Sequence, residues 1–168
     1  MAAGNTYVAL ATNTLGSAAA SVTFSSISGA YTDLVLVVNA ASASGTVSSK
    51  IQFNGDTATS YSDTILYGDG TSAASLRNST MDSAFLNYYG EATTTLLSQT
   101  LIVNIQNYAN TTTYKTFIAR ASSAPSGVVL IVGLWRSTSA ITSVLLKSSS
   151  ANNYAAGSTF TLYGIAAA

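Results

Sequence analysis

The chain has 168 residues, and its six lysines and arginines balance six aspartates and glutamates, so that only 7% of it is charged against about 25% in a typical globular protein. Its polar surface must come from 26 serines and 23 threonines. With no histidine and no cysteine it cannot build a Ser-His-Asp or Cys-His site, a zinc site of the usual ligands, an iron–sulfur cluster or a disulfide, so most hydrolase and metalloenzyme chemistry is excluded.

Short runs of β-branched and aromatic residues recur between Ser, Gly, Asn and Asp, which is typical of a sheet protein. About ten strands are predicted from eleven candidate segments. In chain order these are Tyr7–Ala11, Ser21–Phe24, Asp33–Val38, Lys50–Phe53, Thr64–Tyr67, Ala84–Tyr88, Thr100–Gln106, Tyr114–Ala121, Val128–Arg136, Ile141–Lys147 and Thr159–Gly164. The last strand is expected to pair near the first. Residues Ala73–Met81 carry a weak signal for a short helix.

Two of these strands alternate apolar and polar residues, as expected when one face is buried. In Asp33–Val38, residues 34, 36 and 38 share an apolar face, and in Thr100–Gln106 residues 101, 103 and 105 do. The run Val128–Trp135 is instead apolar on both faces. It should therefore lie centrally in a sheet, or its second face should meet a neighbouring subunit. Gly133 within this run is a candidate position for a β-bulge.

Tight turns separate the predicted strands. Asn-Gly and Asp-Gly pairs occur in FNGD (53–56) and YGDG (67–70), and NYANTTT (107–113) is a further turn signal. No linker, charge block or shift in composition divides the chain. We therefore expect one domain over residues 1–168, an all-β fold built as an antiparallel, jelly-roll-like β-sandwich.

Charge and hydropathy also narrow the partners. The basic residues are dispersed and form no stripe that could neutralise a run of phosphates, so nucleic acid is not an expected partner. No basic region precedes an apolar stretch at the N-terminus, and the longest apolar run falls well short of the roughly 20 residues of a membrane helix. We expect neither a signal peptide nor membrane insertion. Zero net charge removes self-repulsion, which favours a subunit of an assembly.

Three carboxylates, Asp56, Asp63 and Asp69, fall within 14 residues of loop-rich sequence. A glycosidase needs two carboxylates across a sugar and no histidine, and three carboxylates with backbone carbonyls can hold calcium. Turn geometry explains two of them more simply, because Asp56 and Asp69 stand in Asn-Gly-Asp and Gly-Asp-Gly. No EF-hand spacing is present. We therefore expect no enzyme, no catalytic residue, no metal site and no cofactor.

Tyrosine is frequent, with ten tyrosines against five phenylalanines and one tryptophan. Its large apolar body and polar tip suit both the rim of a core and contact surfaces. Trp135 lies in an apolar run, which favours the core or a subunit interface over a sugar platform. The candidate contacts to a subunit or ligand are Tyr61, Tyr67, Tyr88, Tyr89, Tyr108, Trp135 and Tyr154.

Three stretches that together cover nearly the whole chain share their order and spacing with a known family. They are SVTFSSISGAYTDLVLVVNA (21–40), KIQFNGDTATSYSDTILYGDG (50–70) and GLWRSTSAITSVLLKSSSANNYAAGSTFTLYGIA (133–166). The chain resembles small β-sandwich proteins in the virions of tailed bacteriophages, including cyanobacterial phages. The resemblance rests on turn and strand signatures and brings no catalytic motif with it.

This resemblance implies a structural component of the virion, assembled in the host cytoplasm: a capsid decoration or head-fibre module, or a tail-fibre or tail-tip module. Its partners would be other virion proteins and itself, with a homotrimer as the expected oligomer because phage fibres often have three-fold symmetry. We expect a small decorating or capping subunit, since a complete tail fibre carries a long N-terminal shaft. The alternative is a receptor-binding module that recognises a host surface glycan through Tyr-lined loops.

Overall fold

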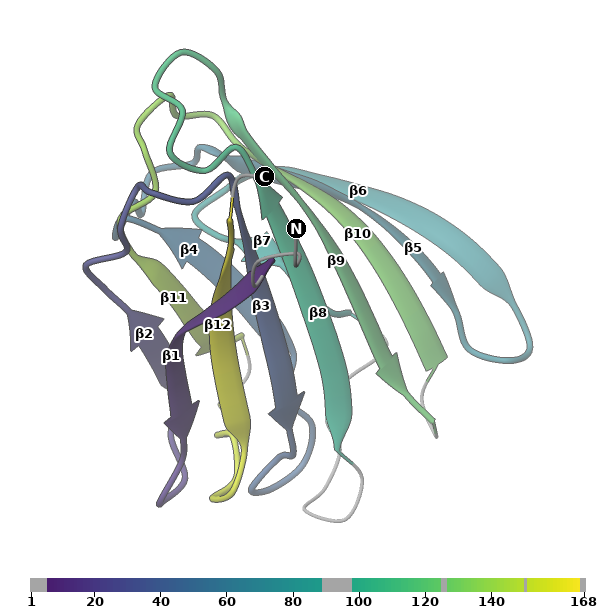
Figure 1. Cartoon of the computed structure of the whole chain (residues 1–168). Coiled ribbons are helices and arrows are strands. Elements are labelled where there is room, and N and C mark those ends of the chain that lie inside the picture. Colours follow the sequence, from purple (N-terminus) through teal and green to yellow (C-terminus); the bar gives the residue numbers. More distant parts are fainter. Residues whose placement is uncertain (1–5, 89–97, 125–126, 150, 167–168) are drawn as a thin grey trace.

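The computed structural model describes residues 6–88, 98–124, 127–149 and 151–166. All regular structure in these ranges is β, with twelve strands arranged in an eight-stranded and a four-stranded antiparallel sheet (Figure 1). The predicted all-β, antiparallel sandwich is therefore confirmed. It has more strands than the ten or so expected, and they are unequally divided between the two sheets.

The larger sheet contains eight strands in the order β1-β12-β3-β8-β9-β10-β5-β6. Their bounds are β1 Tyr7–Thr14, β12 Thr159–Ile165, β3 Asp33–Ala40, β8 Gln99–Gln106, β9 Lys115–Ser123, β10 Gly127–Trp135, β5 Tyr61–Gly68 and β6 Ala73–Met81. The prediction that the last strand pairs near the first is confirmed, because β12 is hydrogen-bonded to β1 along its length.

The smaller sheet has the order β2-β11-β4-β7. Its strands are β2 Ser21–Phe24, β11 Val144–Ser148, β4 Ser49–Phe53 and β7 Ala84–Phe85, so the strands predicted at 84–88 and 141–147 are shorter than expected. In Figure 1 this sheet lies behind the part of the larger sheet formed by β1, β12 and β3, while β10, β5 and β6 fan out to one side. The larger sheet therefore extends beyond its partner.

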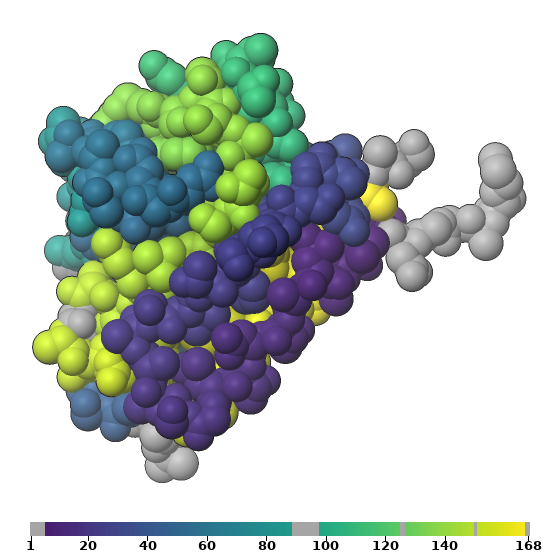
Figure 2. All heavy atoms as spheres, turned by 90° about the vertical axis from the view of Figure 1, so that its left-hand side faces the viewer, coloured from purple at the N-terminus to yellow at the C-terminus, as the bar shows by residue number. Residues whose placement is uncertain are grey.

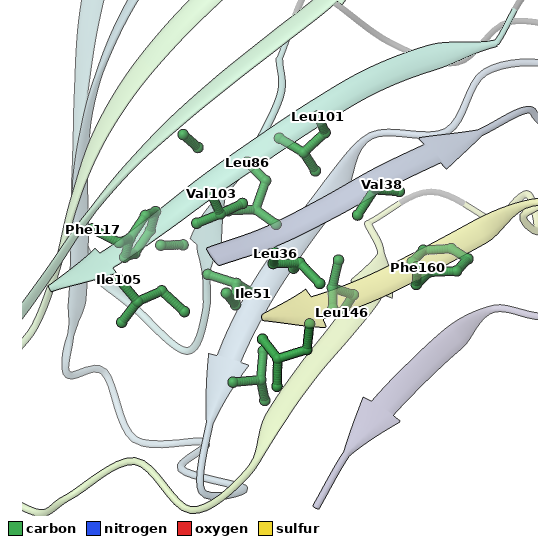
Figure 3. Close-up of a cluster of buried hydrophobic side chains, with 14 of the residues drawn as sticks. Leu36, Val38, Ile51, Leu86, Leu101, Val103, Ile105, Phe117, Leu146 and Phe160 are labelled. Carbon is green, nitrogen blue, oxygen red and sulfur yellow. The ribbon is translucent and has the colours of Figure 1, made fainter. Parts of the chain in front are cut away.

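The core lies between the sheets and follows the predicted alternation. Residues 34, 36 and 38 of β3 and residues 101, 103 and 105 of β8 are at most 1% exposed. They meet Ile51 and Leu146 of the smaller sheet and Phe160 of β12 in the cluster of Figure 3. Burial of each such side chain contributes about 1.5–3 kcal/mol, so this layer supplies the main stabilisation of the fold.

Strand β10 is paired on both sides, with β9 and with β5, as expected for a central strand. The predicted bulge at Gly133 is wrong, because both registers run through this residue without a shift. A Cβ atom at position 133 would lie 2.0 Å from Cζ of Phe117. The glycine therefore makes room for a ring of the neighbouring strand rather than for a bulge.

The short helix predicted at residues 73–81 is also wrong, since these residues form β6. Asp69 Oδ1 accepts hydrogen bonds from the backbone amides of Thr71 at 2.9 Å and Ser72 at 2.7 Å, and Gly70 has a φ of 89°. This turn returns the chain beside β5, with Gly68 paired to Ala73. The hydrogen bonds of the hairpin override the weak local helix preference.

Candidate interaction surface

The face of β10 that points away from the smaller sheet presents large aliphatic side chains to solvent. Val128, Leu130 and Val132 are 61%, 44% and 51% exposed. The alternate residues 129, 131 and 135 are at most 4% exposed, because they point into the core. The sequence expectation of a strand that is apolar on both faces therefore holds, and within this chain only one of the two faces is covered.

Neighbouring strands widen this aliphatic surface, because the register aligns their outward-facing residues. Leu130 is paired with Leu66 of β5, which is 54% exposed, and Val132 is paired with Ile118 of β9, which is 40% exposed. These four residues and Val128 are termed the outer apolar patch. Isolated exposed aliphatic residues are normal on a protein surface, but a contiguous group across three paired strands is a feature of contact sites.

The distribution of exposed apolar residues supports this reading. Among the described residues, eight large hydrophobic side chains are exposed, and five of them form the patch. A sixth, Tyr7 of β1, lies on the same side of the larger sheet, where its ring meets the edge of Tyr163 at a centroid distance of 6.1 Å. The outward face of the larger sheet thus holds most of the exposed apolar surface.

Two arginines stand beside the outer apolar patch. Arg120 of β9 is paired with Leu130, and Arg77 of β6 is paired with Thr64, which in turn is paired with Val132. Both side chains are exposed. Neither guanidinium has an ion pair or a hydrogen bond within the part of the chain that the structure describes. The patch therefore combines aliphatic surface with two cations that have no partner there.

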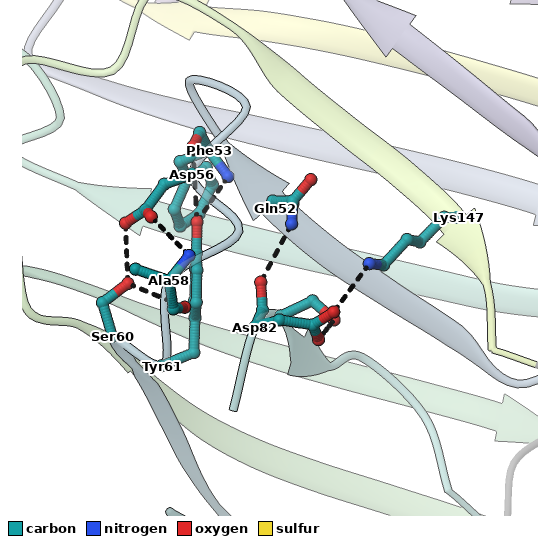
Figure 4. A network of polar contacts seen from close by, with 9 residues as sticks. Gln52, Phe53, Asp56, Ala58, Ser60, Tyr61, Asp82 and Lys147 are labelled. Atoms are coloured by element: carbon teal, nitrogen blue, oxygen red, sulfur yellow. Dashed lines mark hydrogen bonds and ion pairs between the residues drawn. The ribbon is translucent and has the colours of Figure 1, made fainter. Parts of the chain in front are cut away.

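The outward face of the smaller sheet is built differently. Lys147 Nζ lies 3.6 Å from Asp82 Oδ2, Gln52 Nε2 donates to the backbone oxygen of Asp82 at 2.9 Å, and Lys50 Nζ lies 4.2 Å from the centre of the Phe85 ring. The first two contacts are drawn in Figure 4. The charged groups of this face therefore already have partners within the chain, as is usual on a solvated surface.

Four of the seven predicted aromatic contacts, Tyr61, Tyr108, Trp135 and Tyr154, are at most 2% exposed. Their polar atoms bond inside the chain: Tyr61 Oη accepts from the amide of Phe53 at 2.8 Å (Figure 4), and Trp135 Nε1 donates to Asp56 at 2.6 Å. Tyr154 Oη is 2.9 Å from Ser49 Oγ, and Tyr108 Oη donates to the backbone oxygen of Ser28. These side chains anchor strands and loops, and in this structure a partner cannot touch them.

The other three aromatic candidates are placed differently. Tyr67 is half-buried at the end of β5, where it lines a hollow of about 350 Å³ with Leu66, Val128 and Leu130 of the patch. Tyr88 is 36% exposed, and its ring stands edge-on to Phe85. Tyr89 lies outside the described residues. Of the seven, Tyr67 alone adjoins the outer apolar patch in the described structure.

The carboxylates of Asp56, Asp63 and Asp69 each take part in a separate hydrogen-bond network. Asp56 accepts three hydrogen bonds, among them that of Trp135 Nε1, which keep its pKa below the usual value. Asp63 is buried and accepts from Asn78 Nδ2 at 2.8 Å, and burial raises its pKa. Asp69 caps the turn before β6. Within the described ranges, no group of three ligating side chains is placed to hold a metal ion.

A cleft of about 440 Å³ opens between β1 and β2, at the side of the sandwich that faces the viewer in Figure 2. Its lining includes Leu10 and Leu162 together with the hydroxyl-bearing residues Ser25, Ser26 and Tyr31. Sequence reasoning missed Tyr31, because the residue lies between two predicted strands in a stretch that carries no recognisable motif. The cleft offers hydroxyl groups and an aromatic ring without any charge.

Comparisons with protein-family models and with curated proteins find no match to the chain. Among the described residues no helix could cross a membrane. The candidate interaction surface is therefore defined by the chemistry and geometry of this chain alone.

Proposed function

We propose that the chain is a non-enzymatic structural subunit of a tailed-phage virion, and that it attaches to the particle by protein–protein contact through the outer apolar patch. The virion assignment is supported by the sequence resemblance of residues 21–40, 50–70 and 133–166. The contact is supported by one observation above all: five neighbouring aliphatic side chains on paired strands are 40–61% exposed. Surfaces of this kind mark interaction sites in soluble proteins.

The size of the sheet suits such a contact. Eight strands about 4.8 Å apart, each about eight residues long at 3.3 Å per residue, form a face of roughly 900 Å², so a partner centred on the three strands of the patch has room to bury the roughly 800 Å² of a standard interface by extending onto neighbouring strands. Covering the patch stabilises the complex by several kcal/mol, at about 1.5–3 kcal/mol for each fully buried side chain before the costs of association.

The test uses virions of the phage that encodes the chain. Gradient-purified particles are expected to contain the protein in stoichiometric amounts by mass spectrometry. Val132→Ser is expected to remove it from the particles, whereas Leu145→Ser, on an outward position of β11, is expected to leave it in place. Circular dichroism of both variants controls for folding. Particles without the wild-type chain would contradict the proposed function.

The predicted homotrimer stays a prediction of its own. Light scattering of the purified chain at tens of micromolar tests it without reference to the particle. A monodisperse monomer would contradict self-association while leaving attachment to other virion proteins intact.

Recognition of a neutral host glycan is a second candidate, favoured by the cleft between β1 and β2. Sugars stack on aromatic rings and bond to hydroxyl groups, both of which line this cleft. A glycan array probed with the wild-type chain, with Tyr31→Ala and with Tyr88→Ala as a control tests it. Binding that is lost with Tyr31→Ala alone would support this candidate.

A further inference from the structure

We infer that the occupant of the outer apolar patch is a different protein, whose surface presents aliphatic side chains together with a carboxylate for Arg120, and not a second copy of this chain. The inference rests on the proposed function, because it names the partner of the same face.

Arg120 stands beside the patch and has an apolar neighbour on each adjacent strand. The register places it between Ile102 of β8 and Leu130 of β10. It also lines a hollow of about 280 Å³ together with Ile102 and Val128. A partner that covers the patch therefore removes water from this guanidinium as well. Burying an unpaired charge is costly, whereas a carboxylate can accept two parallel hydrogen bonds from arginine.

Arg77 provides a second cation on the opposite flank. It lines a hollow of about 230 Å³ with Val132 and Leu134 of β10. Asp63 lines the same hollow, but its carboxylate accepts hydrogen bonds from Asn78 and Phe85 and forms no ion pair with Arg77. Asp33, at the start of β3, is the only carboxylate at an outward strand position of this sheet within the described ranges, and β8 separates β3 from β9. The complementary surface is therefore an aliphatic ridge with an acidic residue that faces Arg120, whose hollow contains no carboxylate of this chain.

A second copy of the chain does not offer that surface. Each of the five described carboxylates already has a partner inside its own chain: Asp33 accepts from the amide of Asn107, Asp82 pairs with Lys147, and Asp56, Asp63 and Asp69 accept the hydrogen bonds given above. No described carboxylate belongs to the patch, so two copies joined through their patches would bury both Arg120 side chains with no described carboxylate among the patch residues. Like charges in a desolvated interface oppose association.

Photo-crosslinking on the virion tests the identity of the occupant. A benzophenone amino acid replaces Leu130 in the patch or, as a matched control, Leu145 on the outward face of the smaller sheet. The expected result is a crosslink from position 130 to another virion protein, close to an aspartate or glutamate, and none from position 145. A crosslink from position 130 to another copy of this chain would overturn the inference.

Removal of one cation from each face tests the role of charge. Arg120→Ser is expected to weaken rebinding to particles stripped of the protein by roughly 10- to 100-fold, the usual loss for a charge-assisted hydrogen bond. Lys147→Ser, which removes a cation from the smaller sheet, is expected to rebind like the wild type. Arg120→Glu combined with an arginine at the crosslinked acidic residue is expected to restore binding.

The outcomes separate the two proposals. Absence of the chain from virions would sink the proposed function. Normal rebinding of Arg120→Ser by a chain that is present on virions would overturn this inference alone. Vesicles of phosphatidylcholine and phosphatidylglycerol supply the remaining control, because binding to them that depends on Arg120 would make an anionic membrane the occupant and overturn the inference as well.

Discussion

Adjacent residues of β10 have opposite surroundings. Ile131 is fully buried in the core, while Val132, the next residue, is 51% exposed on the other face. Both are β-branched and aliphatic, and both stand in a strand that is paired on either side. The inward residue stabilises the fold, whereas the outward residue is available to a partner. Substitutions at neighbouring positions can therefore separate stability from attachment.

The largest expected effect is on the inward face. Ile131→Ala should lower the free energy of unfolding by about 2–5 kcal/mol, because it removes buried methyl groups and leaves a cavity. Val132→Ala should change it by less than about 0.5 kcal/mol, as usual for exposed positions. Urea unfolding followed by tryptophan fluorescence measures both. Equal losses for the two variants would mean that the outward face also stabilises the isolated chain.

A second test adds an atom to the inward face instead of removing several. Gly133→Ala should cost about 1–3 kcal/mol, since its Cβ would overlap the ring of Phe117 and force a shift in β9 or β10. Gly16→Ala is the control, because no atom lies within 4 Å of a Cβ built there. Thermal unfolding compares the two. Unchanged stability of Gly133→Ala would show that the ring has another place to go.

Alkaline pH should lower the free energy of unfolding by ionising buried tyrosines. Burial raises the pKa of Tyr154 to about 12 and also raises those of Tyr61 and Tyr108. The folded chain therefore keeps phenol protons that the unfolded chain releases near pH 10. The contribution of these groups to the free energy of unfolding is complete below pH 10 and decreases as the pH rises toward 12. Buried Lys115, whose pKa is lowered, acts in the opposite direction and offsets part of the loss.

Absorbance at 295 nm against pH measures this effect, with unfolding followed in parallel by circular dichroism. The three buried phenols should ionise only as the chain unfolds. Their ionisation in a chain that is still folded would contradict the burial of these three side chains.

The smallest expected effect is that of metal removal. The carboxylates of Asp56, Asp63 and Asp69 are used in separate hydrogen-bond networks. EDTA should therefore leave the midpoint of thermal unfolding unchanged. A decrease of several degrees in this midpoint would indicate that these residues bind calcium. Repeating the measurement with added calcium would check that result.

Local patterns in the sequence predicted most of the strands. The alternation in β3 and β8 specifies which face is buried, and the Asp-Gly pair at 69–70 specifies the turn after β5. Strand β6 could not be predicted in this way, because it is an edge strand rich in Ala and Ser that is held by its pairing to β5. The role of Gly133 was predicted wrongly as a β-bulge, because the ring that requires a glycine there belongs to Phe117, which lies in another strand.

The interaction surface was only half predictable. The apolar run of β10 indicated an uncovered or central face, but the contributions of Leu66, Ile118 and Arg120 depend on cross-strand register, which local patterns do not contain. The aromatic candidates were misleading for a related reason. Tyr154, for example, follows a loop-like sequence, yet it bridges to Ala19 and Ser42 and is fully buried.

A density map of the virion at side-chain resolution tests most directly whether the outer apolar patch is a contact face. The expected map shows another virion protein covering Leu130 and Val132, with a carboxylate within hydrogen-bond distance of Arg120. A map in which this face is open to solvent, while the chain is attached through its smaller sheet or its loops, would contradict that assignment.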